Sequence, residues 1–160
     1  NAAGPLRGKK GATYEGGIRV PLVVSWPGKI KSGSESDHIS GFQDLLPTFA
    51  ELAGAKVPAN IDGISFVPEL LGRPSQKEHE YLYWELGTRQ GLRKGNWKVV
   101  RNSTKKKLGK VEIYNLTNDI GEGTDLATQR PELAADFLEL LQIARKPSEL
   151  FPIPVLDNEK

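Results

Sequence analysis

The sequence of 160 residues contains neither cysteine nor methionine. The lack of cysteine excludes disulfide bonds, thiolate metal sites and a cysteine nucleophile, and it leaves the redox compartment open. Because methionine is absent, we expect the chain to be a fragment from inside a longer protein. No stretch reaches the roughly 18 consecutive apolar residues that a membrane-spanning helix requires.

The chain also lacks a strong net charge, since 22 basic and 20 acidic side chains leave it at +2. This balance gives no reason to expect a nucleic-acid or membrane partner. The charge is uneven, however, because residues 1–31 carry six basic side chains and only one acid, Glu15. Such a basic segment favours either an anionic small molecule or simple solubility.

The first half of the chain combines loop, strand and helix signals. A glycine-rich loop over residues 1–19 leads into the continuously apolar segment 20–26, which predicts a strand buried on both faces of an α/β sheet. The apolar spacing over residues 44–53, followed by Gly54, predicts a helix. The polar segment 72–80 then indicates a domain boundary.

The second half has the composition of a small antiparallel sheet. Short segments rich in aromatic and β-branched residues begin near residues 81, 91, 97 and 111, and residues 94–96 have the sequence of a hairpin turn. Pro131 and the apolar stripe after it predict a helix that covers one face of the sheet. We therefore expect one domain over residues 1–75 and a second, made of about four antiparallel strands and a helix, over residues 76–160.

The glycine-rich stretch from Leu6 to Pro21 is the strongest candidate for a functional site. Its glycines allow a ligand to approach the backbone closely. Lys10 could donate a charge-assisted hydrogen bond to a tetrahedral oxyanion there, worth about 1.5–3 kcal/mol. The residues alone leave a second interpretation open, in which Lys9 and Lys10 are solvated surface lysines.

A series of motifs runs along almost the whole chain. In order, it comprises residues 10–21 (KGATYEGGIRVP), 26–30 (WPGKI), 44–48 (DLLPT), 51–54 (ELAG), 61–65 (IDGIS), 83–85 (YWE), 93–98 (RKGNWK), 113–116 (IYNL) and 119–122 (DIGE). Together these motifs resemble the C-terminal portion of the type I sulfatases, the arylsulfatase family within the alkaline-phosphatase-like superfamily. The first motif resembles the lysine-containing second signature of that family.

The resemblance implies an α/β fold, with the end of an alkaline-phosphatase-like sulfatase domain followed by the antiparallel-sheet subdomain. It also implies that Lys10, four residues before the aromatic Tyr14, contacts the substrate sulfate and helps to neutralise charge on the ester being cleaved. Lys10 is thus the expected catalytic and substrate-binding residue. Ion pairs and close packing around it are expected to come from Glu15, Gly16, Gly17 and Arg19.

Sulfatases of this type use a formylglycine nucleophile, made within a Cys/Ser-x-Pro-x-Arg signature, and a calcium ion. This chain contains no such signature. The resemblance therefore implies calcium and formylglycine for the full-length enzyme, and no cofactor or metal site within this chain. The implied partners are the N-terminal part of the same protein and a sulfated small molecule or glycan. The implied location is periplasmic, secreted or lysosomal, and the chain alone is expected to be inactive.

The remaining polar and aromatic candidates have competing interpretations. His79 lies in the polar boundary segment, where we expect it to be exposed, and substrate contact is its alternative role. The aromatic residues Tyr83, Trp84 and Trp97 are expected in the core of the sheet, or else they form a platform for a sugar or aryl group. Two other functions stay open: a phosphoesterase of the same superfamily and a non-catalytic glycan-binding module.

Overall fold

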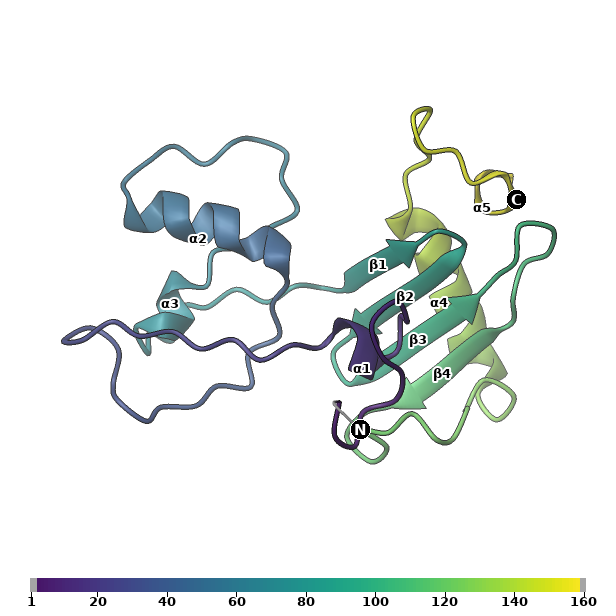
Figure 1. Cartoon of the computed structure of the whole chain (residues 1–160), viewed down its shortest axis with the longest axis horizontal. Coiled ribbons are helices and arrows are strands. Elements are labelled where there is room, and N and C mark those ends of the chain that lie inside the picture. The colour runs from purple at the N-terminus through teal and green to yellow at the C-terminus, as the bar shows by residue number, and fades with distance from the viewer. Residues whose placement is uncertain (1–2, 159–160) are drawn as a thin grey trace. The chain divides into compact units, whose positions relative to one another are not determined.

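The computed structural model describes residues 3–158, which form two compact units (Figure 1). The first unit combines the residues up to Val20 with those from Tyr81 onward, and the second is Pro21–Glu80. The glycine-rich segment at the start of the chain therefore packs with the sheet that begins more than 60 residues later. The domain boundary predicted near residue 75 concerns the full-length fold and stays a prediction.

A four-stranded antiparallel sheet in the order β1-β2-β3-β4 forms the centre of the first unit. Its strands are β1 (Leu82–Leu86), β2 (Arg89–Lys94), β3 (Trp97–Asn102) and β4 (Val111–Asn115). Lys94 pairs with Trp97 across a two-residue turn in which Gly95 has a φ of 55°. Because tight hairpin turns require positive φ, this glycine explains the turn. The predicted hairpin and sheet are confirmed.

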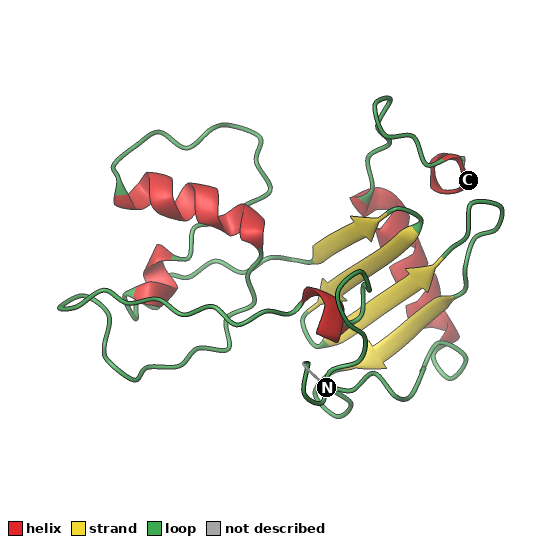
Figure 2. Cartoon of the chain, viewed as in Figure 1, coloured by secondary structure: helices red, strands yellow, loops and turns green. Residues whose placement is uncertain are grey.

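The helix α4 (Pro131–Ala144) covers one face of this sheet, as predicted (Figure 2). The core between them is formed by five buried residues: Leu92, Val99, Ile113, Phe137 and Leu141. A short helix, α5 (Pro154–Asp157), follows and is tied to the unit by an Arg145–Asp157 ion pair of 2.5 Å. Among the described residues no helix is both long and apolar enough to span a membrane.

The opposite face of the sheet is covered by the N-terminal segment, which contains the one-turn helix α1 (Glu15–Ile18). Strand residues point alternately to the two faces, so the partners of this segment come from positions between those of the α4 core. Thr13 and Glu15 are only 2% and 1% exposed. The segment predicted as loop is therefore an integral layer of the first unit.

The second unit contains the 3-10 turn η1 (Phe42–Asp44) and the helices α2 (Leu45–Leu52) and α3 (Val67–Leu70). The helix predicted over residues 44–53 is confirmed, and Gly54 follows it with a φ of 65°. Its apolar face is not buried, however. The exposed fractions are 53% for Leu46, 61% for Phe49 and 41% for Leu52.

The prediction of a buried strand over residues 20–26 is wrong. The segment has no regular secondary structure, and Leu22 and Val23 are 59% and 90% exposed. A buried strand requires hydrogen-bonding partners for its backbone. Within residues 3–158 no strand pairs with this segment. Its apolar composition is therefore left without a partner surface inside the described part of the chain.

Candidate functional site

Lys10 lies at the tip of a tight turn formed by residues 9–12. The Ala12 N–H donates to the Lys9 carbonyl at 2.9 Å, and Gly11 has a φ of 88°, as expected for the third residue of a type II turn. The Lys10 side chain is exposed, and within residues 3–158 it has no hydrogen-bond or ion-pair partner. Its ammonium group is therefore accessible to an anionic ligand.

Strand β2 holds this turn against the sheet. Arg89 Nη1 donates a hydrogen bond to the Gly11 carbonyl at 2.5 Å, and Thr13 Oγ1 donates to the Gln90 carbonyl at 3.3 Å. Gly91 permits this close approach, because a Cβ atom there would lie 3.0 Å from the Cβ and carbonyl oxygen of Thr13. The residues that flank Lys10 are thus fixed although its side chain is free to reach outward.

Helix α1 packs against the same turn through Gly17 and against the preceding residues Arg7 and Gly8 through Gly16. A Cβ atom at Gly17 would lie 2.1 Å from the Ala12 carbonyl oxygen, and one at Gly16 would lie 2.5 Å from that of Arg7. Real Cβ atoms do not approach backbone this closely, so any larger residue would move α1 or the turn. Gly17 therefore allows α1 to contact the Lys10 turn directly, and Gly16 allows α1 to contact the segment that leads into this turn.

Glu15 anchors α1 to the sheet through buried ion pairs. Its carboxylate is 1% exposed and lies 3.4 Å from Arg93 Nη1 and 3.4 Å from Lys98 Nζ. The half-exposed Arg19 lies farther away, at 4.0 Å. The structure brings the predicted residues Glu15 and Arg19 together, but the closer partners are two residues that we did not single out. The sequence signal that could have identified Arg93 and Lys98 is the motif at residues 93–98, which contains both residues.

Glu122 completes this buried cluster. Its Oε2 accepts a hydrogen bond from the Glu15 N–H at 2.8 Å, and the residue is fully buried with a φ of 51°. Desolvation raises the pKa of Glu122 to about 7, although the Glu15 N–H and Lys98 oppose the shift. Desolvation also lowers the pKa of Lys98, which the two carboxylates partly offset. Burial therefore disfavours the charged forms of both Glu122 and Lys98.

We expect the free energy of unfolding to decrease as the pH rises from about 4.5 to about 7. The folded pKa of Glu122 lies above its ordinary value of 4.5, so the folded state binds more protons than the unfolded state in this window, and raising the pH removes that advantage. Urea denaturation at several pH values measures the slope. Glu122→Gln should flatten it and the exposed control Glu149→Gln should not; an unaltered slope in Glu122→Gln would contradict the assignment.

A second polar cluster holds the start of the loop. The Arg7 guanidinium lies 4.1 Å from the centroid of the Tyr14 ring and donates to the Tyr114 hydroxyl at 2.8 Å. The Tyr14 hydroxyl donates to Glu112 Oε2 at 2.7 Å. Burial and the neighbouring Glu112 carboxylate raise the pKa of Tyr14 to about 12. Tyr14, the aromatic residue of the lysine motif, therefore anchors the loop to β4.

His79 belongs to the other unit, and the expectation that it is exposed is wrong. Its side chain is 10% exposed, and its Nε2 lies 2.8 Å from Asp44 Oδ1. Asp44 also accepts hydrogen bonds from the N–H groups of Gly41 and Ile64. A buried carboxylate requires such partners, which explains why the histidine is drawn inward. Contact between His79 and a substrate stays a prediction.

The described residues do not fit a metal site. Within residues 3–158 no group of three or more histidine, aspartate or glutamate side chains is arranged to hold a metal ion. The buried Glu15 carboxylate lies 3.4 Å from Lys98 Nζ instead, and the Glu122 carboxylate accepts a hydrogen bond from the Glu15 N–H. A calcium site of the kind that the resemblance implies for the full-length enzyme is thus not built from this part of the chain.

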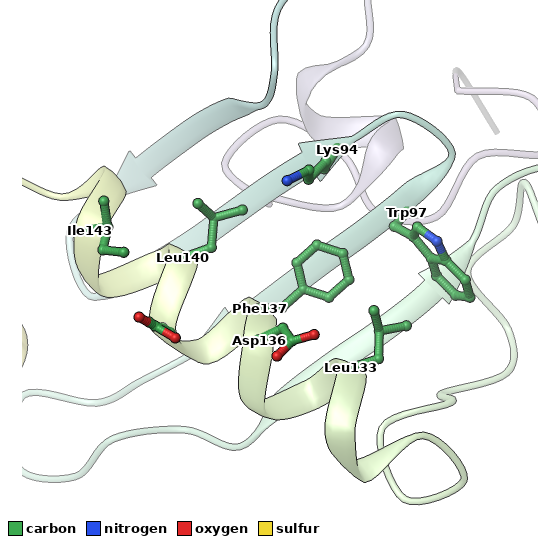
Figure 3. Close-up of a pocket in the computed structure, with 8 residues that line it drawn as sticks. Lys94, Trp97, Leu133, Asp136, Phe137, Leu140 and Ile143 are labelled. Atoms are coloured by element: carbon green, nitrogen blue, oxygen red, sulfur yellow. The ribbon is translucent and has the colours of Figure 1, made fainter.

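A shallow groove of about 350 Å³ lies between α4 and the β2–β3 hairpin (Figure 3). It is lined by Lys94 and Trp97 from the hairpin and by apolar and acidic residues of α4. Trp84 lies on the other face of the sheet, where its ring centroid is 4.9 Å from Lys98 Nζ. Because neighbouring strand residues point to opposite faces, Tyr83 and Trp84 cannot share one platform. The structure therefore does not bring the three predicted aromatic residues together.

Comparison with known proteins assigns the chain to a family. Residues 9–147 match the family model for the C-terminal region of N-sulphoglucosamine sulphohydrolase. A sulfatase of Formosa agariphila is 35% identical over 144 residues, which cover 79% of this chain and 26% of that protein. Steryl-sulfatase of Rattus norvegicus is 48% identical over 82 residues, 50% of this chain and 14% of that enzyme. The chain thus spans about a quarter or less of the length of these relatives.

Solved structures of sulfatases contain the same fold. Ps i-CgsB is 31% identical with a TM-score of 0.72, and the match covers 88% of this chain and 32% of that chain. A sulfatase solved in work on glycosaminoglycan metabolism by Bacteroides thetaiotaomicron is 26% identical with a TM-score of 0.74, with the same coverage. These matches confirm the expected α/β sulfatase fold class with its antiparallel C-terminal part. The chain belongs to the type I sulfatase family and corresponds to the C-terminal portion of its members.

Proposed function

We propose that the full-length protein containing this chain hydrolyses sulfate esters, and that Lys10 contacts the sulfate group. The observation that carries this proposal is the Lys10 turn, which presents an exposed ammonium group, without a partner among residues 3–158, on a backbone held by β2 and α1. A cation that is positioned before the reaction can stabilise charge that develops in the transition state. Membership of the sulfatase family supports the type of reaction.

In this proposal the chain contributes binding and charge stabilisation. The Lys10 ammonium donates hydrogen bonds to the oxygen atoms on which negative charge accumulates as the S–O bond breaks, and such bonds are stronger when the charge is greater. The chain contains no formylglycine precursor signature, and the residues that the structure describes form no fitting calcium site. We propose that both groups belong to the part of the protein outside this chain.

For the substrate we propose a sulfated carbohydrate or an aryl sulfate. Names of similar proteins support the carbohydrate class: an ulvan-active sulfatase of Formosa agariphila is 45% identical over 67 residues, and Ps i-CgsB was solved with k-i-k-neocarrahexaose. The aryl class is supported by arylsulfatase A of Bos taurus, which is 42% identical over 83 residues. Initial rates of the full-length enzyme on 4-nitrophenyl sulfate, sulfated oligosaccharides and 4-nitrophenyl phosphate test this proposal. Hydrolysis of the phosphate ester alone would instead support the phosphoesterase alternative.

We propose the N-terminal part of the same protein as the partner of the unit Pro21–Glu80. This unit exposes apolar side chains both in the segment from Leu22 to Trp26 and on α2. Soluble monomers rarely leave large contiguous apolar patches uncovered. Relatives extend well beyond the region that matches this chain, so their additional residues offer a covering surface.

We expect the isolated chain to be inactive. It lacks the nucleophile signature, and Lys10 alone can stabilise charge but cannot attack sulfur. The chain and the full-length enzyme should be assayed with 4-nitrophenyl sulfate at equal molar concentrations. Turnover by the chain alone, surviving repeated purification by two independent methods, would refute this prediction.

A non-catalytic glycan-binding function is a second candidate, and the groove beside Trp97 is the observation that favours it. The groove combines an indole ring with apolar and charged side chains, a combination suited to stacking and hydrogen bonding with sugars. Calorimetric titration of the protein with sulfated and unsulfated oligosaccharides tests it. If neither binds, or if Trp97→Ala leaves binding unchanged, this candidate is excluded.

A further inference from the structure

Three buried polar atoms without a hydrogen-bond partner come from residues that meet beneath α1. They are Glu15 Oε1, Lys98 Nζ and Glu122 Oε1. The Lys98 side chain, from β3, is 0% exposed and lies 3.4 Å from Glu15 and 4.9 Å from the Trp84 ring centroid. Burying an ammonium group costs several kcal/mol, and well-packed apolar residues often serve stability equally well. The cluster therefore calls for an explanation beyond stability.

The cluster is connected directly to the turn that carries Lys10. Glu15 begins α1, and its N–H donates to Glu122 while its carboxylate contacts Lys98. Two residues further along, Gly17 leaves no space between α1 and the Ala12 carbonyl. A shift of Glu15 would therefore move α1 into or away from residues 9–12. The position of the Lys10 backbone depends on where the buried cluster holds Glu15.

The contacts of Lys98 set it apart from the other cationic partners of Glu15. Arg93 is partly exposed and also donates to the Gly95 carbonyl, and Arg19 is half-exposed at 4.0 Å. Lys98 is fully buried and lies 3.4 Å from Glu15. Both carboxylates of the cluster act to raise the pKa of Lys98, whereas only Glu15 acts in this way on Arg93. Lys98 is thus the cation that is attracted both by Glu15 of α1 and by Glu122.

We propose that Lys98 is a positioning residue for Lys10: its buried ammonium fixes Glu15 between β3 and Glu122, and α1 transmits that position to the Lys10 turn. This inference rests on the proposed contact between Lys10 and the sulfate. Misplacing a catalytic group by about 1 Å can cost on the order of 100-fold in rate. Because Lys10 is assigned to charge that develops in the transition state, the loss should fall on kcat rather than KM.

The test is a double-mutant cycle in the full-length enzyme, with 4-nitrophenyl sulfate as substrate. Lys98→Met keeps most of the side-chain length without the charge, and the exposed Lys110→Met is the matched control. We expect Lys98→Met to lower kcat by about 10- to 100-fold with KM changed less than about 3-fold. In the Lys10→Ala background, adding Lys98→Met should change kcat less than about 3-fold, since residues that act through one another are not additive.

The outcomes separate this inference from the proposed function. If Lys10→Ala has no effect, the proposed function fails and the inference fails with it. If Lys10→Ala is strongly impaired but Lys98→Met is fully active, or if the two effects multiply, only the inference is overturned. A purely stabilising role for Lys98 would lower the amount of folded enzyme while leaving kcat per active site unchanged.

A second pair of variants covers the case in which Lys98→Met does not fold. Glu122→Gln keeps an oxygen that can accept the Glu15 N–H, whereas Glu122→Leu cannot accept it. We expect Glu122→Leu to show the same kcat loss of about 10-fold or more, non-additive with Lys10→Ala, and Glu122→Gln to restore most of the rate. Equal kcat values for the two variants would overturn the inference.

Discussion

Lys10→Ala in the full-length enzyme is expected to lower kcat for 4-nitrophenyl sulfate by about 100- to 1000-fold, the usual effect of losing one positioned donor to developing charge. The structural reason is that Lys10 projects from a held turn and has no partner within residues 3–158. Its ammonium therefore does not serve an internal contact. Steady-state kinetics with active-site titration measures the effect.

The control is Lys9→Ala, because Lys9 is an exposed neighbour with the same charge. A general electrostatic attraction of the anionic substrate would make the two variants alike and would decrease as salt is added. A specific contact at Lys10 predicts a large loss in Lys10→Ala alone, together with unchanged thermal stability. Similar kinetic losses in the two variants would contradict the assignment of Lys10.

Glu15→Ala is expected to destabilise the first unit by about 3–5 kcal/mol, the typical cost of removing one partner from a buried ion pair. The substitution would leave Lys98 and Arg93 without the carboxylate that lies 3.4 Å from each of them. Urea denaturation of the full-length enzyme, followed by tryptophan fluorescence, measures the change. Trp84 is a suitable local reporter because its ring lies beside Lys98.

The matched control for this variant is Glu149→Ala, since Glu149 is an exposed glutamate. A surface substitution of this kind usually changes the unfolding free energy by less than about 0.5 kcal/mol. A loss below about 1 kcal/mol in Glu15→Ala would show that Arg93 and Lys98 rehydrate or repack easily. The buried cluster would then not be a significant source of stability.

Local sequence signals were sufficient to predict much of the secondary structure in the C-terminal part of the chain. Gly95 marks the β2–β3 hairpin because few other residues adopt its positive φ, and Pro131 marks the start of α4 because a missing N–H costs nothing at that position. The apolar stripe of α4 identified the face that packs on the sheet. These features depend on interactions between residues a few positions apart.

The structure of segment 20–26 could not be predicted from local sequence signals. Its composition indicated a buried strand, but a strand forms only where another strand supplies hydrogen bonds, and the described residues supply none. The prediction that His79 is exposed was wrong for a related reason. Its polar sequence neighbours suggested exposure, whereas Asp44, 35 residues earlier in the chain, binds its side chain and keeps it largely buried. Both outcomes depended on partners that local sequence does not reveal.

The sequence by itself determined the family, the small antiparallel sheet with its helix and the choice of Lys10 as the residue to test. Only the tertiary structure decided how Lys10 is supported, because Glu15, Lys98 and Glu122 are far apart in the chain and meet beneath α1. The physical reason is that periodicity and turn preferences report on neighbours within a few residues. The pairing of buried charges is set by which segments pack together, and this follows from burial of the whole unit.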